Sequence, residues 1–457
     1  MQVRPRESKV KIMFSAVAIR LLGPAMAYKA YRSYWLGTLA SVAGFQMLTF
    51  SQYVIIHRLT HDPKYLAWVA LASAVPAIVL NIYGGVLADK LDRRRLIAVT
   101  QIVNGSLILI LTILTFAEIV RPIHVIILAF LSGAVNAFDQ PARQALFPSL
   151  INPKVMMNAV ALNSAIWTGI RIIAPAFAGL IIALAGEGVS FFLSALGFFT
   201  MAVVVLTLHV PAVNNSSPSG RSGGAWGSPR RRGGPLEGLK FIAANNVFVS
   251  LIGMSFFNSF FGMAYIPMMP VFAEEILKVG VEGQGILMGL GGVGALAMTM
   301  TLGRMVNIKQ RGLLIIIGAL MFGLLLATFS ISAQLVGNYY LAMVLMFIMG
   351  MSSSVYMISI MSSLQLMVPN DMRGRIMGFY SMTYSIMPLG GLYAAGAAGL
   401  FGGGSEGVPS AVALGGLFVA LFAIGPALLN SNVRNVGILT QDFQSDNSSK
   451  AVSSASD

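Results

Sequence analysis

Residues 84–96 read GGVLADKLDRRRL, a short stretch that carries six charges: two aspartates, one lysine and three consecutive arginines. Uncharged runs of 24 residues (65–88) and 22 residues (96–117) stand on either side of these charges. Each run is long enough to cross a bilayer as a helix, which takes about 20 mostly apolar residues. Because charge is costly in hydrocarbon, we predict that the charged stretch is a short loop at a membrane surface.

The composition of the 457-residue chain predicts an integral membrane protein surrounded by a lipid bilayer. Hydrophobic residues make up 56% of it and charged residues 10%, whereas a soluble protein carries about 25% charged residues. The net charge of +14 raises a nucleic-acid partner as an alternative, but the basic residues gather in alternate loops, which indicates topology instead. With no cysteine in the chain, disulfides and thiolate metal sites are excluded. We expect no metal and no cofactor.

Apolar runs between charged or proline-bearing breaks predict twelve membrane-spanning helices. Among them are helix 1 (33–56), helix 4 (about 122–138), helix 5 (about 157–185, ending at a turn at 186–188), helix 7 (about 247–273), helices 9 and 10 (within 312–370, on either side of a turn at 332–338) and helix 11 (about 376–400). A glycine-, serine- and arginine-rich stretch follows the sixth helix and predicts a flexible linker without a core. We therefore expect an all-α membrane protein with five segments: a basic cytosolic lead-in (1–32), an N-terminal six-helix bundle (33–210), the cytosolic linker (211–240), a C-terminal six-helix bundle (241–430) and a disordered cytosolic tail (431–457).

The distribution of lysine and arginine predicts the orientation of the chain. Of the 30 such residues, 25 fall on the side that holds both termini and four fall on the other side. The remaining one, Arg171, lies inside a predicted helix. By the positive-inside rule, both termini lie in the cytoplasm of a multi-pass protein of the cell membrane.

The two predicted bundles repeat each other in sequence. The basic loop at 89–95 has a weaker counterpart at 304–311. A proline-bearing connection followed by a small-residue helix occurs at 148–179 and again at 369–391. These offsets predict two pseudo-symmetric halves with the linker between them.

The opening stretch carries a recognisable spacing of glycine, aspartate and arginine at Gly85, Leu87, Asp89, Arg93 and Arg94. It resembles the motif G-x-L-a-D-r-x-G-r-r that transporters of the major facilitator superfamily carry between their second and third helices. Asp92 replaces the last glycine of that motif. The resemblance implies the fold of the superfamily, in which two six-helix halves bind a substrate between them near the middle of the bilayer.

Segment 136–181 carries three further patterns, P-a-x-x-a-l-x-P, N-A-x-x-L-N-S and R-i-x-g-P-x-x-A-G. The matching residues are Pro141, Ala142, Ala145, Pro148, Asn158, Ala159, Leu162, Asn163, Ser164, Arg171, Pro175, Ala178 and Gly179. The patterns resemble the branch of the superfamily that contains the enterobactin exporter and the macrolide-efflux permeases. This resemblance implies export of an amphipathic small molecule, either a drug-like compound or a siderophore, with protons as the coupling ion.

The motif also implies a cytoplasmic gate. Asp89 would face the positive N-terminal end of helix 11, while an arginine of the motif pairs with Asp139 at the end of helix 4. The alternative is a solvated loop that only sets topology. The residues assigned to the gate are Gly85, Asp89, Arg93, Arg94, Asp139, Arg143 and Arg373.

Asp139 and Arg143 stand four residues apart and would share one face of a helical turn. Three interpretations are open: a local ion pair at the membrane surface, a partner of the gate, or a proton carrier. All 16 acidic residues are expected in loops, tails or helix ends. Proton coupling therefore rests on the resemblance, because antiporters often use a carboxylate buried within a helix.

Polar residues on helices 1, 4, 5, 7 and 10 are candidates for a substrate cavity, because polar groups at membrane depth face protein or a water-filled path. Helix–helix hydrogen bonding is the alternative for each of them. For Arg171, the alternatives are an anchor for an anionic or polar substrate group and a structural arginine. The candidates are Gln46, Thr49, Gln52, Asn136, Arg171, Asn258, Tyr265, Tyr356 and Ser359.

Small residues and prolines on helices 5 and 11 predict close packing and bending, at Pro175, Gly179, Pro388 and Gly391.

The four histidines lie at the ends of predicted spans. His57 and His61 are four residues apart and could hold a metal weakly, but we expect a solvated loop there.

Two classes of function compete, a transporter and a membrane-embedded enzyme. An exporter of small molecules, working as a monomer, agrees with the motif, the repeat and the branch patterns. Import or facilitated diffusion is the competing direction. A membrane-embedded enzyme would need a cluster of carboxylates or histidines or a soluble catalytic domain, and the linker supplies neither. We therefore predict a transporter and not an enzyme.

The gate interpretation predicts the effect of one conservative substitution. Asp89→Asn removes the charge that would latch the two halves, so transport turnover should be crippled while the protein still reaches the membrane. Transport by membrane vesicles, with the amount of inserted protein measured alongside, checks this. Normal turnover of the variant would contradict the gate assignment.

Overall fold

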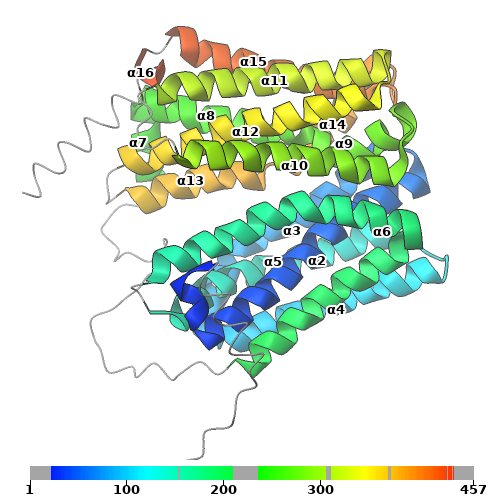
Figure 1. Cartoon of the computed structure of the whole chain (residues 1–457), viewed down its shortest axis with the longest axis vertical. Helices are drawn as coiled ribbons and strands as arrows, with labels where there is room; N and C mark the ends of the chain where they lie inside the picture. The colour runs from blue at the N-terminus through cyan, green and yellow to red at the C-terminus, as the bar shows by residue number, and fades with distance from the viewer. Residues whose placement is uncertain are drawn as a thin grey trace, which may run out of the picture.

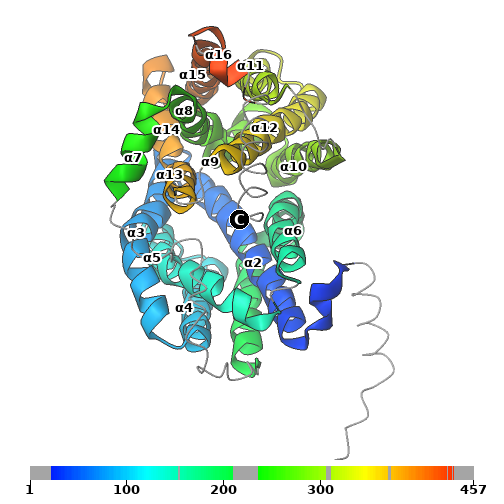
Figure 2. The ribbon, with the colours of Figure 1, turned by 90° about the vertical axis from the view of Figure 1, so that its left-hand side faces the viewer.

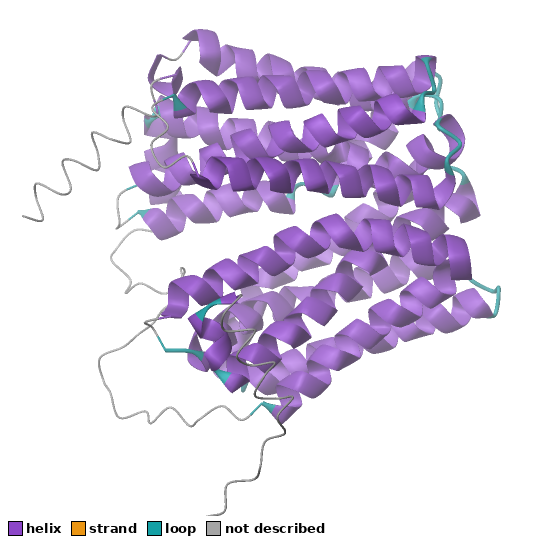
Figure 3. Ribbon diagram, viewed as in Figure 1, coloured by secondary structure: helices purple, strands orange, loops and turns teal. Residues whose placement is uncertain are grey.

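The structure is a computed structural model that describes residues 22–152, 155–208, 235–304, 310–368, 372–429, 431–434 and 436. Every regular element within these ranges is a helix, as Figure 3 shows, which confirms the prediction of an all-α protein. Ten of the described helices are long and apolar enough to cross a membrane.

The N-terminal half consists of long helices joined by short turns. The last of them, α6, is two helices joined at Gly186, whose φ of 83° breaks the helix at the expected turn. The bounds are η1 (Pro24–Ala27), α2 (Lys29–Thr60), α3 (Pro63–Lys90), α4 (Arg93–Phe116), α5 (Pro122–Leu146), η2 (Phe147–Leu150) and α6 (Met156–Thr207).

The C-terminal half is more interrupted. One of its membrane crossings runs through α8, α9 and a π-helix, and another is divided between α13 and α14. The bounds are α7 (Pro235–Ala244), α8 (Asn246–Phe260), η4 (Gly262–Ala264), α9 (Tyr265–Pro270), η5 (Val271–Ile276), α10 (Gly280–Arg304), α11 (Arg311–Leu335), α12 (Tyr339–Met367), α13 (Arg373–Ser385), α14 (Leu389–Ala398), η6 (Gly399–Phe401), α15 (Val408–Leu429) and α16 (Ser431–Arg434).

Twelve crossings follow from these helices. Dividing α6 at Gly186 adds one crossing to the ten long helices. The divided path through α13 and α14 adds another, since its second part is the shorter apolar helix at Leu389–Phe401. Six crossings precede the linker and six follow it, which confirms the predicted architecture.

Side chains at the helix ends explain why the turns are short. Asp62 accepts a hydrogen bond from the backbone N–H of Lys64, ahead of Pro63 at the first position of α3. Asp92 accepts from the N–H groups of Arg94 and Arg95 and caps α4. The aspartate that replaces the motif's glycine therefore has a structural role, because it starts the third crossing.

One predicted boundary is wrong. The fourth helix was expected to end near residue 138, but α5 continues to Leu146 and contains Pro141. Proline lacks the N–H that would bond one turn back, so it weakens a helix, yet within membrane proteins neighbouring groups compensate for the loss. Asp139 consequently lies inside a spanning helix and not in a loop.

Each half is packed mainly on itself. In the first half α2 and α4 pack on α6, and α3 packs on α5. In the second half α10 and α11 pack on α12, and α11 packs on α15. Figure 1 shows the two groups of helices stacked as separate bundles, and Figure 2 shows the same bundles along the helix axes.

The two ends of the bundle differ in how the halves meet. We call the end at Thr207 and Pro235, on either side of residues 209–234, the linker end, and the opposite end, at Thr60 and Ile276, the far end. Figure 1 shows the halves converging toward the far end and diverging toward the linker end.

Glycines allow the halves to touch near the far end. A Cβ atom on Gly179 of α6 would lie 2.7 Å from the carbonyl oxygen of Val281 in α10, and one on Gly285 would lie 2.8 Å from that of Pro175. On the other flank α14 packs on α3, where a Cβ on Gly391 would lie 3.6 Å from Ala67 Cα. Pro388 immediately precedes α14 as its N-cap residue. Such close backbone contact is what small residues allow in membrane helices.

The linker end lacks a comparable interface among the described residues. Its apolar cluster in the first half, which includes Tyr31, Leu96 and Leu208, contains residues of that half alone. The main contacts of α13 are with α7, α8 and α12 of its own half. The structure is therefore closed at the far end and separated at the linker end.

A pair of matched substitutions on α6 tests this interface. Gly179→Ala places a methyl group against α10 and should cost the far-end-closed conformation about 1–3 kcal/mol. Gly169→Ala adds the same methyl group where no atom lies within 4 Å, and both changes bring the same gain in helix propensity. Pulsed electron spin resonance between labels at Ile119→Cys and Val336→Cys, in the far-end loops of the two halves, measures the result. We expect longer far-end distances for Gly179→Ala alone; identical distributions for both variants would contradict the interface.

Candidate functional site

An ion pair and a histidine–carboxylate contact join the two halves at the far end. Arg58 of α2 donates through Nε to Oε1 of Glu274 in η5, at 3.0 Å. Its Nη1 atom contacts Glu187 of its own half. His57 Nε2 lies 2.9 Å from Glu275 Oε1. These contacts bridge the halves, since α2 belongs to the first half and η5 to the second.

The prediction of a solvated loop at His57 is wrong. α2 continues to Thr60, so His57 lies in its last turn and is fully buried. The sequence carried one signal for this site: Glu274 and Glu275 fall on the same predicted membrane side as His57 and Arg58. Opposite charges confined to one side of a membrane are candidates for pairing.

At the linker end the motif arginines bind backbone carbonyls of their own half. Arg93 donates to the carbonyl of Ala145 at 2.9 Å and Arg94 to that of Leu208 at 2.7 Å. Neither arginine pairs with Asp139 in this conformation. The structure describes neither the surroundings of Gly85 nor the side chains of Asp89 and Arg373, so the latch assigned to them stays a prediction.

Asp139 and Arg143 form a buried ion pair within α5. Arg143 Nε lies 2.5 Å from Asp139 Oδ2, and the two residues are 8% and 4% exposed. Asp139 Oδ1 also accepts from Thr100 Oγ1 at 2.8 Å and from Gln101 Nε2 at 3.0 Å, both of α4. Arg143 Nη2 donates to Ser41 Oγ of α2 at 2.9 Å.

This pair corrects one statement about the acidic residues. The ion pair between neighbouring turns does form, and it is buried among α2, α4 and α5. The chain also has a carboxylate inside a spanning helix, which the predicted boundary at residue 138 had placed in a loop. A buried carboxylate of this kind is a candidate for carrying a coupling proton.

Arg171 stands between the halves. It lies in the first part of α6 with an exposed side chain. It is close enough to interact electrostatically with Tyr265 of α9 and Tyr384 of α13, which both belong to the other half. Tyr384 in turn shares a hydrogen bond of 2.7 Å with Tyr380. Tyr265 was a predicted candidate. Sequence reasoning missed Tyr380 and Tyr384, although their spacing of four residues on helix 11 was the available signal.

The polar side chains of several other cavity candidates take part in helix packing. Asn104 of α4 donates to Asn136 Oδ1 at 3.1 Å and accepts from Ser132 at 2.9 Å, so these residues join α4 to α5. Thr49 donates to the carbonyl of Phe45 one turn earlier in α2. Gln46 is half-buried on the same helix.

In the second half the candidates are buried. Asn258 is 1% exposed, and its Oδ1 lacks a hydrogen-bond partner among the described residues. Tyr356 is fully buried beside Phe322, with ring centroids 5.9 Å apart, and its hydroxyl likewise lacks a partner there. Ser359 is buried on the same helix, α12. Their polar atoms can be reached only after the packing around them changes.

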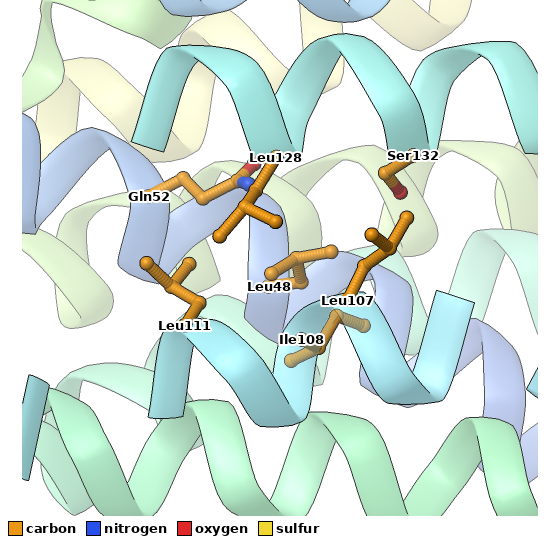
Figure 4. A pocket seen from close by; sticks show the side chains of 7 residues that line it. All are labelled: Leu48, Gln52, Leu107, Ile108, Leu111, Leu128 and Ser132. Atoms are coloured by element: carbon orange, nitrogen blue, oxygen red, sulfur yellow. The ribbon is translucent and has the colours of Figure 1, made fainter. Parts of the chain in front are cut away.

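A small pocket inside the first half involves Gln52. Figure 4 shows it between α2, α4 and α5, and it leaves no room for a water molecule. It is a packing gap and not a binding cavity. Its lining consists of Leu48, Gln52, Leu107, Ile108, Leu111, Leu128 and Ser132.

Two six-helix halves that are closed on each other at one end of the bundle and separated at the other have the architecture of a transporter of the major facilitator class. The chain belongs to the transmembrane secretion effector family of that superfamily, whose model matches residues 22–454.

Named relatives agree with this assignment. The staphyloferrin A transporter of Staphylococcus aureus is 26% identical over 75% of this chain and 83% of its own length. The enterobactin exporter of Shigella boydii is 24% identical over 78% and 81%. The macrolide efflux protein A of Streptococcus pyogenes is 22% identical over 78% and 85%. The family and the fold exclude an enzyme.

Solved structures share the fold. A bacterial homologue of the human lysosomal transporter Spinster, in an inward-facing and unoccupied conformation, aligns with a TM-score of 0.66 at 15% identity over 92% of this chain and 98% of its own. The nucleoside transporter NupG aligns with a TM-score of 0.64 at 14% identity over 87% and 98%.

The buried ion pair predicts a measurable difference in stability. Asp139→Asn leaves Arg143 buried without its counter-charge and should cost about 3–5 kcal/mol. The double variant Asp139→Asn with Arg143→Gln should recover part of this loss. Glu237→Gln is a matched control, because Glu237 pairs with Arg375 at an exposed position and such pairs contribute little. Thermal unfolding of the purified protein in detergent measures all three variants. Equal losses for Asp139→Asn and Glu237→Gln would refute the buried-pair interpretation.

Proposed function

We propose that this transporter exports amphipathic small molecules, of the drug-like or siderophore kind, from the cytoplasm by alternating access. In this proposal the linker end faces the cytoplasm, as the excess of basic residues on that side indicates. The conformation described above is then inward-facing, with its exit closed by the glycine contacts, the ion pair of Arg58 with Glu274 and the contact of His57 with Glu275.

One observation carries the proposal: Arg171 is exposed within a membrane-spanning helix and faces tyrosines of the opposite half. An arginine at this depth is costly unless it meets an anion, a carbonyl group or water. No ion pair or direct hydrogen bond joins it to another described residue. An acidic or strongly polar group of a substrate would satisfy it, while the phenol rings of Tyr265 and Tyr384 would contact the apolar part.

The direction of transport and the cargo class are supported by the relatives. One is named for enterobactin export and another for macrolide efflux, and a third is named for the siderophore staphyloferrin A. We assign proton coupling to Asp139, since it is the buried carboxylate within a described spanning helix. Protonation would weaken its bond to Arg143 and loosen the contacts of α5 with α2 and α4. The working unit in this proposal is the monomer, since each chain contains both halves.

Transport by inside-out vesicles tests the proposal, after growth inhibition across a panel of antibiotics, and under iron starvation, has identified a compound. Acid inside the vesicles should drive uptake of that compound. Arg171→Gln should lower uptake about 10- to 100-fold, the factor that a charged hydrogen bond of roughly 1.5–3 kcal/mol implies, and Arg171→Lys should lower it less. Lys64→Gln, which removes a charge from an exposed far-end position, is the matched control.

Three outcomes would contradict separate parts of the proposal. Unchanged uptake by Arg171→Gln would remove the substrate-anchor assignment. Accumulation that occurs only in right-side-out vesicles would show import instead of export. Uptake that is indifferent to the pH gradient would remove proton coupling and the role of Asp139.

A further inference from the structure

Three side chains with metal-binding atoms meet at the far end, between the halves. They are His57 and His61 of the first half and Glu275 of the second, and one ligand atom of each lies within 4.8 Å of the others. Glu275 Oε1 is 2.9 Å from His57 Nε2 and 3.9 Å from His61 Nδ1. The two histidines lie together at the end of α2, with ring centroids 5.8 Å apart.

Three buried polar atoms of this cluster, on His57 and Glu275, lack hydrogen bonds among the described residues. His57 is fully buried, and neither of its ring nitrogens has a hydrogen-bond partner among the described residues. Glu275 Oε1 is also a buried atom without such a bond, although it lies 2.9 Å from His57 Nε2. Buried polar atoms without partners are costly. An ion that accepts electron pairs would give Glu275 Oε1 and one ring nitrogen of His57 a shared partner.

Two of the three spacings between ligand atoms are close to those around a tetrahedral metal ion. Bonds of about 2.0–2.1 Å place neighbouring ligand atoms of a tetrahedral site about 3.3 Å apart. The distances of 2.9 and 3.9 Å lie on either side of this value, and His61 can adjust because its side chain is 71% exposed. Two imidazoles and one carboxylate favour Zn²⁺ and similar transition-metal ions over Ca²⁺ and Mg²⁺, which prefer oxygen ligands.

The surrounding charges also favour a divalent cation. Arg58 contacts Glu187 and Glu274 next to this cluster, and Glu275 adds a third carboxylate. With neutral histidines these four charged groups sum to −2, which a divalent ion would neutralise. Glu275 is presented by the π-helix η5, where one extra residue per turn turns successive carboxylates toward different partners.

We propose that His57, His61 and Glu275 bind a Zn²⁺-class divalent ion that holds the far end of the transporter closed. Because α2 and η5 belong to different halves, the ion links them in the far-end-closed conformation. Separation of the halves pulls Glu275 away from the histidines and destroys the site. The three protein ligands leave a fourth position for water, and the exposed His61 provides access from the far side. The proposal depends on the movement of the halves and not on the identity of the cargo.

Zn²⁺ binding to the purified full-length chain in lipid nanodiscs tests the site. Calorimetric titration should give one ion per chain, and His57→Ala and Glu275→Gln should each weaken binding by at least about tenfold. His61→Ala is the variant least able to disturb folding, because its side chain is exposed, and it should weaken binding as well. His124→Ala, at the start of α5 on the same membrane side, should bind Zn²⁺ like the wild type. Absence of a saturable site, or equal binding by all variants, would overturn the proposal.

The effect on conformation is measured separately. Spin labels at Ile119→Cys and Val336→Cys can be added without removing native thiols, since the chain has no cysteine. Zn²⁺ should increase the population with short far-end distances, and the increase should be absent in His61→Ala. Binding that leaves the distances unchanged would overturn the latch. So would a shift that appears on acidification without metal and does not appear with Zn²⁺, because protonated His57 would then be the latch.

Discussion

The approach of α6 to α10 at Gly179 and Gly285 is the contact on which the conformation depends. In hydrocarbon there is no hydrophobic force that pushes helices together, so association relies on close packing and on polar contacts. Glycine provides the first, because it lets backbones of opposite halves touch within 2.7 to 2.8 Å of where a side chain would begin. Arg58 and His57 provide the polar contacts, at the far end of the bundle. These two kinds of contact act together at the far end.

Charge within the membrane explains the remaining polar features. The first half keeps Asp139 and Arg143 buried by pairing them and surrounding them with donors from α4 and acceptors from α2. Arg171 lacks such an arrangement and faces the opposite half. The same physical cost therefore has two different results: a neutralised pair inside one half, and an exposed cation that, in the proposed function, binds a group of the substrate between the halves.

Much of the fold could be predicted from the sequence, because spans are set by length and hydrophobicity and the orientation by basic residues. The turn at Gly186 followed from its neighbours in the chain. The end of α5 could not be predicted, since Pro141 is a helix breaker in water and is tolerated where other helices compensate. The pairing of His57 with Glu275 was hidden for a different reason: the two residues are more than 200 positions apart, and only the docking of the halves brings them together. Likewise, the charged motif at 84–96 predicts which residues would form a cytoplasmic gate, but not which conformation the protein adopts.

The central claim is that the two halves rock, so that one end opens as the other closes. Pulsed electron spin resonance on two label pairs in the same nanodisc sample conditions tests it most directly: one pair at the far end, and one at the linker end at Leu91→Cys and Leu239→Cys, which are both exposed and belong to opposite halves. The account predicts that any condition that lengthens the far-end distances shortens the linker-end distances in the same proportion of molecules. Distances that stay fixed at both ends, or that lengthen at both ends together, would contradict it.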